Sequence, residues 1–397
     1  MASDVRDRKP TVLIVGQGSP AKGGIPSFVS DLLLDRWLRE RVRLEYFNTT
    51  PDGVRRPGSA SLANVVLTMR HASRVFARAR KVDVVHLNVA PAPALPLARA
   101  MVLCVAARLA GARTILHAHT GRLDMCSRSP VYRLLLRAAL AISHTFVVVS
   151  VPAERAVARL GRSGKVVRLQ NWVDPDTFGT GPKPTQPPVL TFVGTVCERK
   201  GLLDLCRALV DLRRRRGFQR GDLRVIIVGD SSQEGPGVDA RIRRTFEHAG
   251  LGWVEFVGVL ERPEVLRILA ESSILCLPSH WEGFPLSVLE GMASGAAIIA
   301  TRVGDIPWMI EGAGILLDPG DVGALSRAIE RLVVDQVERD RLGRRGRSRV
   351  EEDLSRSRLV PCVYSLYLGA SGLSQAAAIP SDPVERSDVA DGAHHSI

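Results

Sequence analysis

Two glutamates eight residues apart mark the first segment in which residue types and spacing could do chemistry. Glu282 and Glu290 lie in the segment 279–290, which follows the apolar run SILCLP and continues into an apolar helical pattern where Pro285 suits the first turn. If Glu290 lies two turns inside that helix, it is about 12 Å beyond Glu282 at a rise of about 1.5 Å per residue. The two carboxylates then cannot share one atom, but they can bracket a long ligand.

The start of this helix adds donors for an anion between the two carboxylates. Unpaired backbone N–H groups and the positive end of the helix dipole attract phosphate, and here they belong to Gly283, Phe284, Leu286 and Ser287. A nucleotide sugar fits this arrangement, with Glu290 on the ribose diol, the amides on the diphosphate and Glu282 on the sugar hydroxyls. The alternative is a pair of solvated helix carboxylates, which is common for a single match of this spacing.

A second candidate segment, 193–201, reads VGTVCERKG and joins a strand that ends in glycine to a helix that runs to the arginines at 213–216. Arg199 and Lys200 lie where the loop enters that helix, at the edge where open α/β sheets bind ligands. A cation at this place would face a diphosphate. An exposed surface pair is the alternative, and it suits Arg199 better than Lys200, which is one of only six lysines.

Two loops in the first half of the chain carry weaker signals. Residues 16–25 place four glycines after the first strand, which allows close backbone approach to a ligand, but their spacing is not the GxGxxG of dinucleotide sites. The segment 117–122, HAHTGR, ends another strand with His117 and His119 on one face. No carboxylate or cysteine stands at a metal-ligand spacing nearby, so we expect no metal and expect His119 to point into an interdomain cleft.

Strands that alternate with helices must position these loops, and the sequence has that alternation throughout. Strands are expected at 11–15, 42–47, 82–87, 113–117, 145–149 and 165–169, and again at 189–193, 223–228, 253–257, 273–277 and 296–300. Helices are expected at 26–40, 60–80, 94–110, 130–140 and 152–160, and between the later strands. The pattern predicts an α/β fold with two doubly wound domains.

Length and composition agree with two domains. A chain of 397 residues exceeds the usual size of one hydrophobic core. The segment 171–188 is rich in Pro, Gly and Thr and has no apolar period, so it is interpreted as the connection between the domains, where a cleft should open. From residue 371 to 397 large apolar residues are nearly absent, which predicts a disordered tail.

The cysteines and the apolar segments bear on the cellular compartment of the protein. Six scattered cysteines form no CxxC pair, which favours a reducing, cytoplasmic compartment. The N-terminus has no signal-peptide pattern, and charged residues interrupt the most apolar stretches, 94–110 and 131–151, so no transmembrane helix is expected.

Charge is distributed unevenly along the chain. Residues 1–170 hold 27 Lys and Arg against 10 Asp and Glu, a net of +17, while the remainder of the 54 and 41 leaves −4. One interpretation is a solvated arginine-rich surface that reflects coding bias. The other is a face that lies on an anionic surface, and the absence of nucleic-acid motifs makes the inner face of the plasma membrane the better candidate.

These motifs together make the chain resemble the family 4 retaining glycosyltransferases of the GT-B fold, over about residues 11–368. The resemblance is most specific at 282–295 and 298–305, and it extends to 193–201, 228–230, 23–25 and 117–119. It implies transfer of a hexose from a nucleotide-diphosphate sugar with retained anomeric configuration and no bound metal or other cofactor. The implied divisions are an acceptor-binding Rossmann-like domain (1–170), a linker (171–188), a donor-binding Rossmann-like domain (189–355), a helix returning to the first domain (356–370) and the tail (371–397).

The resemblance assigns a role to each matching position. It implies that Glu290 binds the ribose, that Glu282 contacts the donor-sugar hydroxyls and that Lys200 binds the diphosphate. It also implies donor contacts at the positions flanking these groups, which are Gly24, Gly194, Arg199, Val259, Gly283, Phe284, Pro285 and Leu286. His119 matches the histidine beside the reacting carbon, so the catalytic set is His119, Lys200 and Glu282.

The sequence departs from the family pattern in three places. Thr195 stands where the family has a second diphosphate-binding arginine, which Arg199 would have to replace. Asn171-Trp172 replaces the usual NG, and the segment 303–308, VGDIPW, replaces the VGGxxE pattern. Each departure weakens the expectation of donor binding.

The functional hypothesis is therefore a hexosyltransferase that extends a glycan or lipid-linked acceptor in cell-surface polysaccharide or glycolipid biosynthesis. The enzymatic alternatives are a phosphorylase or a sugar-nucleotide epimerase of the same fold. A non-catalytic binder of sugar nucleotides or nucleic acid on this scaffold is the alternative from another class, because a fold does not fix a function.

Overall fold

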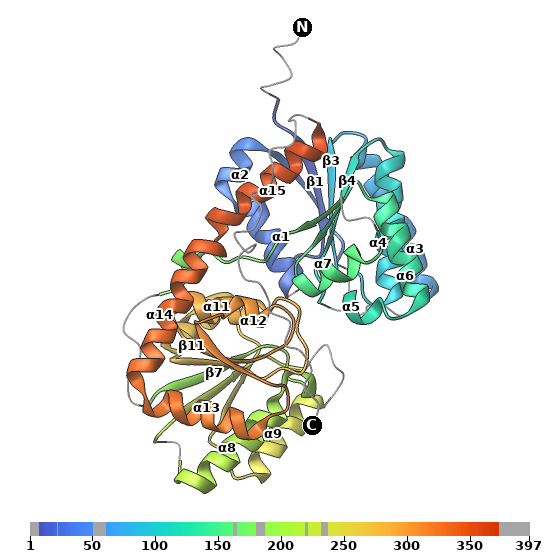
Figure 1. Cartoon of the computed structure of the whole chain (residues 1–397). Coiled ribbons are helices and arrows are strands. Elements are labelled where there is room, and N and C mark those ends of the chain that lie inside the picture. The colour runs from blue at the N-terminus through green and yellow to red at the C-terminus, as the bar shows by residue number, and fades with distance from the viewer. Residues whose placement is uncertain are drawn as a thin grey trace, which may run out of the picture.

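The structure is a computed structural model that describes residues 8–21, 23–50, 61–121, 123–161, 165–179, 187–218, 221–231 and 237–372. Two lobes each contain a six-stranded parallel sheet covered by helices, and they lie one above the other in Figure 1. The predicted α/β class with two doubly wound units is confirmed. Most of the predicted tail, 373–397, and part of the predicted linker, 180–186, lie outside the described residues.

The N-terminal lobe has the strand order β2-β1-β3-β4-β5-β6. Its strands are β1 (Thr11–Gly16), β2 (Arg43–Asn48), β3 (Val84–Val89), β4 (Arg113–Ala118), β5 (Thr145–Val148) and β6 (Val166–Arg168). Its helices are α1 (Gly24–Leu34), α2 (Arg36–Arg41), α3 (Leu62–Ala79), α4 (Ala94–Leu109), α5 (Leu123–Cys126), α6 (Pro130–Ile142) and α7 (Val151–Ala158). Alternate residues of β1 join two different cores, so both faces of this sheet are buried.

The C-terminal lobe has the strand order β12-β11-β10-β7-β8-β9. Its strands are β7 (Val189–Val193), β8 (Arg224–Val228), β9 (Glu255–Gly258), β10 (Ile274–Leu277), β11 (Ala297–Thr301) and β12 (Gly314–Leu317). Its helical segments are η3 (Glu198–Lys200), α8 (Leu202–Arg216), α9 (Val238–His248), α10 (Arg262–Glu271), α11 (Leu286–Ala293), α12 (Ile306–Met309), α13 (Val322–Val334) and α14 (Gln336–Asp353).

Three local expectations are corrected. The helix expected at 26–40 is two helices, because Asp35 is extended and its carboxylate accepts a hydrogen bond from the Leu38 N–H at 2.8 Å, which caps a new helix. Pro285 precedes the first turn of α11 as its N-cap, so Glu290 lies one turn inside the helix instead of two. The edge strand β12 was not predicted.

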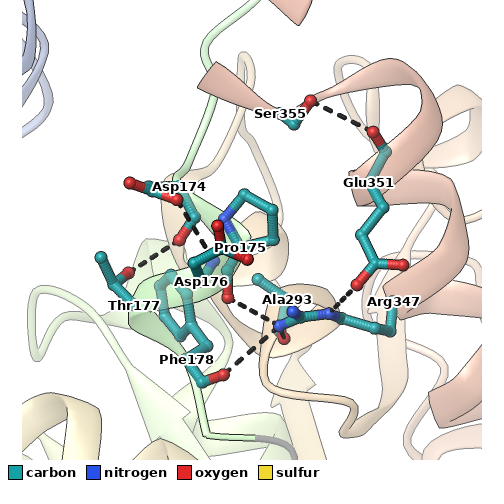
Figure 2. A network of polar contacts seen from close by, with 9 residues as sticks. All are labelled: Asp174, Pro175, Asp176, Thr177, Phe178, Ala293, Arg347, Glu351 and Ser355. Carbon is teal, nitrogen blue, oxygen red and sulfur yellow. Dashed lines mark hydrogen bonds and ion pairs between the residues drawn. The ribbon is translucent and has the colours of Figure 1, made fainter. Parts of the chain in front are cut away.

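The connection between the lobes is fastened to the C-terminal lobe by one arginine. Arg347 of α14 donates to the carbonyl oxygens of Pro175 (2.8 Å), Phe178 (3.4 Å) and Ala293 (2.5 Å), and Figure 2 shows its guanidinium between the connection and the end of α11. Glu351 accepts from the Nε of the same side chain at 2.6 Å. The connecting segment before residue 180 is therefore an ordered part of the second lobe.

The last described helix, α15 (Arg356–Ser371), returns to the N-terminal lobe, where it lies beside α1 and α2 in Figure 1. Arg356 pairs with Asp35 (3.4 Å) and with Asp174 of the connection (2.7 Å). Near the other end of the helix, the Tyr367 hydroxyl lies 2.8 Å from Nδ1 of the buried His86. The chain thus crosses between the lobes twice, and both crossings meet at Arg356.

Candidate active site

A lysine and a glutamate from two loops of the C-terminal lobe form the centre of the site. Lys200 Nζ lies 2.5 Å from Glu282 Oε1, and the Ser279 hydroxyl donates to the same oxygen at 2.8 Å. Gly201 allows the Lys200 loop to approach, because its φ is +73° and a Cβ there would lie 1.9 Å from the Pro278 carbonyl oxygen. The structure therefore brings these two predicted site residues together.

Glu290 lies one turn into α11 and is also nearly buried. It is paired with Arg262, the first residue of α10, whose side chain remains half exposed. Burial raises the pKa of Glu290, and the Arg262 guanidinium opposes that rise. Arg262 also lies over the Phe178 ring, with 5.5 Å from its Cζ to the ring centroid, so the connection between the lobes supports it.

The N-terminal lobe meets this loop through glycines. A Cβ on Gly121 would lie 2.2 Å from Gly283 Cα, and one on Gly24 would lie 3.8 Å from Leu286 Cδ1. The first residue of α1 therefore lies beside the first residue of α11, so the positive ends of two helices from different lobes are neighbours. Asn171 adds a hydrogen bond to the Phe284 carbonyl oxygen at 3.4 Å.

His119 follows β4 and lies two residues before Gly121. Its Nε2 is 2.9 Å from Asn88 Oδ1, while the Asn88 amide nitrogen donates to the His86 carbonyl oxygen. This orientation makes Nε2 the protonated nitrogen of His119 and leaves a lone pair on Nδ1. Burial lowers the pKa of His119 to about 3, so the ring is neutral at physiological pH.

The other histidine of this motif has a structural position. His117 is fully buried, its ring centroid lies 3.9 Å from that of His119, and its Nδ1 is 3.3 Å from Nε2 of His86. Burial lowers its pKa well below the ordinary value. His117 therefore packs beneath His119, which is partly exposed.

Two other predicted donor positions, Gly194 and Arg199, lie beside the lysine and the glutamate loop, and a third, Val259, lies at the end of the edge strand β9. Gly194 is adjacent to the Lys200 side chain, since a Cβ there would lie 3.8 Å from Lys200 Cε. Val259 follows β9 and is half exposed. The Arg199 guanidinium lies 5.3 Å from the Trp281 ring centroid and donates to the Trp281 carbonyl oxygen at 3.4 Å, so it is held beside the glutamate loop.

Asp305 joins the glutamate loop to the opposite lobe, and no sequence motif predicts this role. Its backbone N–H donates to the Gly283 carbonyl oxygen at 2.9 Å, and its two carboxylate oxygens accept from the Val151 N–H at the start of α7, at 2.9 and 3.1 Å. Burial raises its pKa to about 7. The only signal in the sequence was the departure of 303–308 from the family pattern.

Ser279, Asn88 and Arg262 were also missed. Each acts by holding a predicted residue, Glu282, His119 and Glu290 respectively, and their partners are 3, 31 and 28 positions away in the chain.

Within the described ranges, no three His, Cys, Asp or Glu side chains gather as a metal-ligand set. In the same part of the chain, no helix combines the length and apolarity needed to cross a bilayer.

Comparison with known proteins agrees with this architecture. The structure of Anabaena HepE in complex with UDP has a TM-score of 0.68 at 16% identity, covering 90% of this chain and 100% of that one. Sucrose-phosphate synthase from Thermosynechococcus elongatus has a TM-score of 0.72 at 20% identity, covering 92% and 100%. The two facing parallel α/β lobes are therefore a GT-B fold.

The family match lies in the C-terminal lobe. Residues 187–335 match the family Glycosyl transferases group 1. The glycogen synthase of Mycobacterium tuberculosis is 30% identical over 188 residues, 47% of this chain and 44% of the relative. The MMP α-(1→4)-mannosyltransferase of Mycolicibacterium hassiacum is 38% identical over 99 residues, 24% of each chain. The matched region thus spans less than half the length of these curated relatives.

Proposed function

We propose that this protein is a retaining glycosyltransferase that moves a hexose from a nucleotide-diphosphate sugar to a glycan or lipid-linked acceptor. The observation that carries the proposal is the convergence of Lys200 and Glu282 beside the N-terminus of α11, with Gly283 in contact with the opposite lobe. The match of this lobe to group 1 glycosyl transferases supports the same class, and the neighbouring HepE structures hold UDP and UDP-glucose.

The proposed chemistry uses groups that are already in place. Departure of a nucleoside diphosphate leaves negative charge on its β-phosphate, which Lys200 and the N–H groups at the start of α11 stabilise. Glu282 accepts hydrogen bonds from the sugar hydroxyls, and Glu290 accepts from the ribose. These interactions strengthen as charge develops, so they lower the barrier without a bound metal or a protein nucleophile.

On the other side of the reacting carbon, His119 contributes a neutral ring. Its Nδ1 lone pair can accept a hydrogen bond from a sugar hydroxyl, while Asn88 fixes the ring orientation. In the retaining reaction that we propose, the acceptor attacks from the side of the leaving group and the departing phosphate takes its proton. Gly121 and Gly283 bring the two lobes into close contact, and in this proposal that contact limits the access of water to the reaction.

We place the reaction in the cytoplasm, at the inner face of the plasma membrane, in the synthesis of a cell-surface polysaccharide or glycolipid. Six cysteines without a disulfide are compatible with a reducing compartment. Arginines concentrated in the N-terminal half favour an anionic membrane surface as the place of the acceptor.

Incubation of the full chain with radiolabelled UDP-, ADP- and GDP-hexoses tests the proposal. We expect slow hydrolysis of one donor without acceptor, faster turnover with acceptor, and an α-linked product from an α-linked donor in the anomeric proton spectrum. A β-linked product would overturn retention, and loss of all turnover in EDTA would overturn metal independence. Binding of a donor without any turnover would favour the non-catalytic alternative.

A further inference from the structure

Three helices on one side of the N-terminal lobe expose an unusual number of apolar side chains. We call the surface of α3, α4 and α6 the outer helical face. Among the described residues, it carries ten of the 17 large hydrophobic side chains that are exposed, namely Leu62, Val65, Val66, Met69, Phe76, Leu95, Val105, Leu109, Val131 and Leu134. Scattered exposed leucines are ordinary, but a cluster of this kind marks an interaction surface.

The three helices form one continuous layer. Helix α4 packs against both α3 and α6, and Figure 1 shows the three side by side along the sheet. Their inward residues, among them Val75, Leu97 and Leu136, belong to the core beneath the sheet. The exposed apolar residues therefore occupy the opposite, outward side of the layer.

The same face carries positive charges that no acidic side chain on its three helices balances. Helices α3, α4 and α6 hold seven arginines and no Asp or Glu. Across residues 61–144 there are 12 Lys and Arg against Asp83 and Asp124. Arg70, Arg74, Arg133 and Arg137 are exposed, and none of these four forms an ion pair within the described part of the chain.

We propose that the outer helical face docks on an anionic lipid bilayer. Leucine, valine and methionine side chains need an apolar environment and the arginines need anions, and the boundary between lipid headgroups and acyl chains offers both in one plane. A second copy of the chain would oppose this face with the same positive charge. A nucleic-acid backbone would pair with the arginines but would leave the apolar side chains in water.

Chain continuity connects this face to the site. Helix α5, which bears the half-exposed Met125, follows the segment of Gly121 and leads into α6. Docking would therefore hold the membrane beside the loop that meets Gly283. This step rests on the proposed function, and it makes the acceptor a lipid-linked glycan presented at the bilayer surface.

Flotation of the full chain with vesicles tests the proposal. We expect binding to phosphatidylcholine vesicles that contain phosphatidylglycerol, weakening as salt rises, and little binding to pure phosphatidylcholine. The double variant Arg70→Gln/Arg133→Gln should lower the partition coefficient about 25-fold, at about five-fold per arginine. The double variant Met69→Ser/Leu134→Ser should lower it more than about ten-fold.

Matched variants on the C-terminal lobe provide the controls. Val334 and Val337 are 73% and 78% exposed, and their double replacement by serine should leave flotation unchanged, as should Arg214→Gln/Arg244→Gln. Equal flotation of face and control variants would overturn the proposal. The proposal would also be overturned if the face variants float like the parent but lose binding to a DNA duplex, or lose a dimer that forms with rising concentration.

Donor hydrolysis in detergent-free buffer separates this proposal from the proposed function. The face variants should hydrolyse the donor at the parental rate while they fail to float. If the parent floats through this face but turns over no donor, the proposed function fails and membrane docking stands.

Discussion

At the scale of single residues, the proposed donor site depends on the buried pair of Lys200 and Glu282. Exposed ion pairs contribute little, but this pair lies at the end of a parallel sheet with only 12% and 8% of its side chains exposed. Two charges are held there next to a helix N-terminus, where a diphosphate would be bound. Removing either charge should therefore lower donor turnover, and it should also destabilise the fold, because the partner charge stays nearly buried.

We expect Glu282→Gln to lower donor turnover about 10²- to 10³-fold, which is the usual effect of removing one stabilising polar group from a reaction site. The amide keeps a hydrogen-bonding group next to Ser279 but leaves the nearly buried Lys200 ammonium without its counter-charge, so the melting temperature should fall as well. Glu198→Gln is the matched control, because Glu198 belongs to η3 beside Lys200 but pairs with Arg241 on the surface. Steady-state hydrolysis rates decide the matter, and equal rates for both variants would contradict the role of Glu282.

The ion pair of Arg262 and Glu290 should make donor affinity depend on pH. Burial raises the pKa of Glu290 and Arg262 lowers it, so Arg262→Gln should move this pKa higher. Ribose hydroxyls donate to the carboxylate, so donor affinity should fall as the pH drops through the pKa of Glu290. Calorimetric titration at a series of pH values below neutral should place the midpoint of that fall at a higher pH in Arg262→Gln than in the parent. An unchanged midpoint in the variant would refute this link.

At the scale of elements, the two lobes meet where glycines allow backbone contact. Gly121→Ala would place a methyl group 2.2 Å from Gly283 Cα, and since backbone cannot rotate away, the lobes would have to separate. We expect about a 100-fold loss of turnover, because a misplacement of about 1 Å has that effect, together with a larger radius of gyration by X-ray scattering. Gly252→Ala is the control, since nothing lies within 4 Å of a Cβ there. Wild-type turnover in Gly121→Ala would show that this contact is dispensable.

The buried carboxyl of Asp305 should make the stability of the folded protein depend on pH. Its pKa is about 7 in the folded chain and 3.8 for an ordinary Asp, so between these values the folded chain binds a proton that the unfolded chain has released. This group therefore makes the protein less stable as the pH rises from about 4 to about 7. Asp305→Asn cannot titrate, so its melting temperature should fall less over this range than that of the parent. Parallel pH profiles would count against the burial of this carboxyl.

The alternation of strands and helices made the presence of each element predictable from the sequence. The exact residues at which the elements begin and end were harder to predict. Nearly every expected strand is present within a residue or two, because buried parallel strands are short apolar runs that local sequence reveals. The break at Asp35 and the start of α11 after Pro285 depend on one capping interaction and one proline conformation. Lys200 and Glu282 could be predicted from their motifs, whereas Asp305 and Arg262 could not, because their partners are distant in sequence and no local pattern records them.

At the scale of the whole molecule, the parts are divided between two lobes that the chain joins twice. The C-terminal lobe holds the charged groups and is anchored to the connection by Arg347, while the N-terminal lobe supplies His119 and the basic outer helical face. Helix α15 ties the lobes through Arg356. This division is suited to a soluble donor bound by one lobe and an acceptor presented to the other.

Calorimetric titration of the full chain with UDP-, ADP- and GDP-hexoses tests the central claim most directly. We predict that one donor binds with a dissociation constant in the micromolar to millimolar range, that Lys200→Ala weakens this binding at least about ten-fold, and that Glu198→Gln leaves it unchanged. If no donor binds the parent, or if the donor binds Lys200→Ala as tightly as the parent, the lysine and glutamate do not form a nucleotide-sugar site.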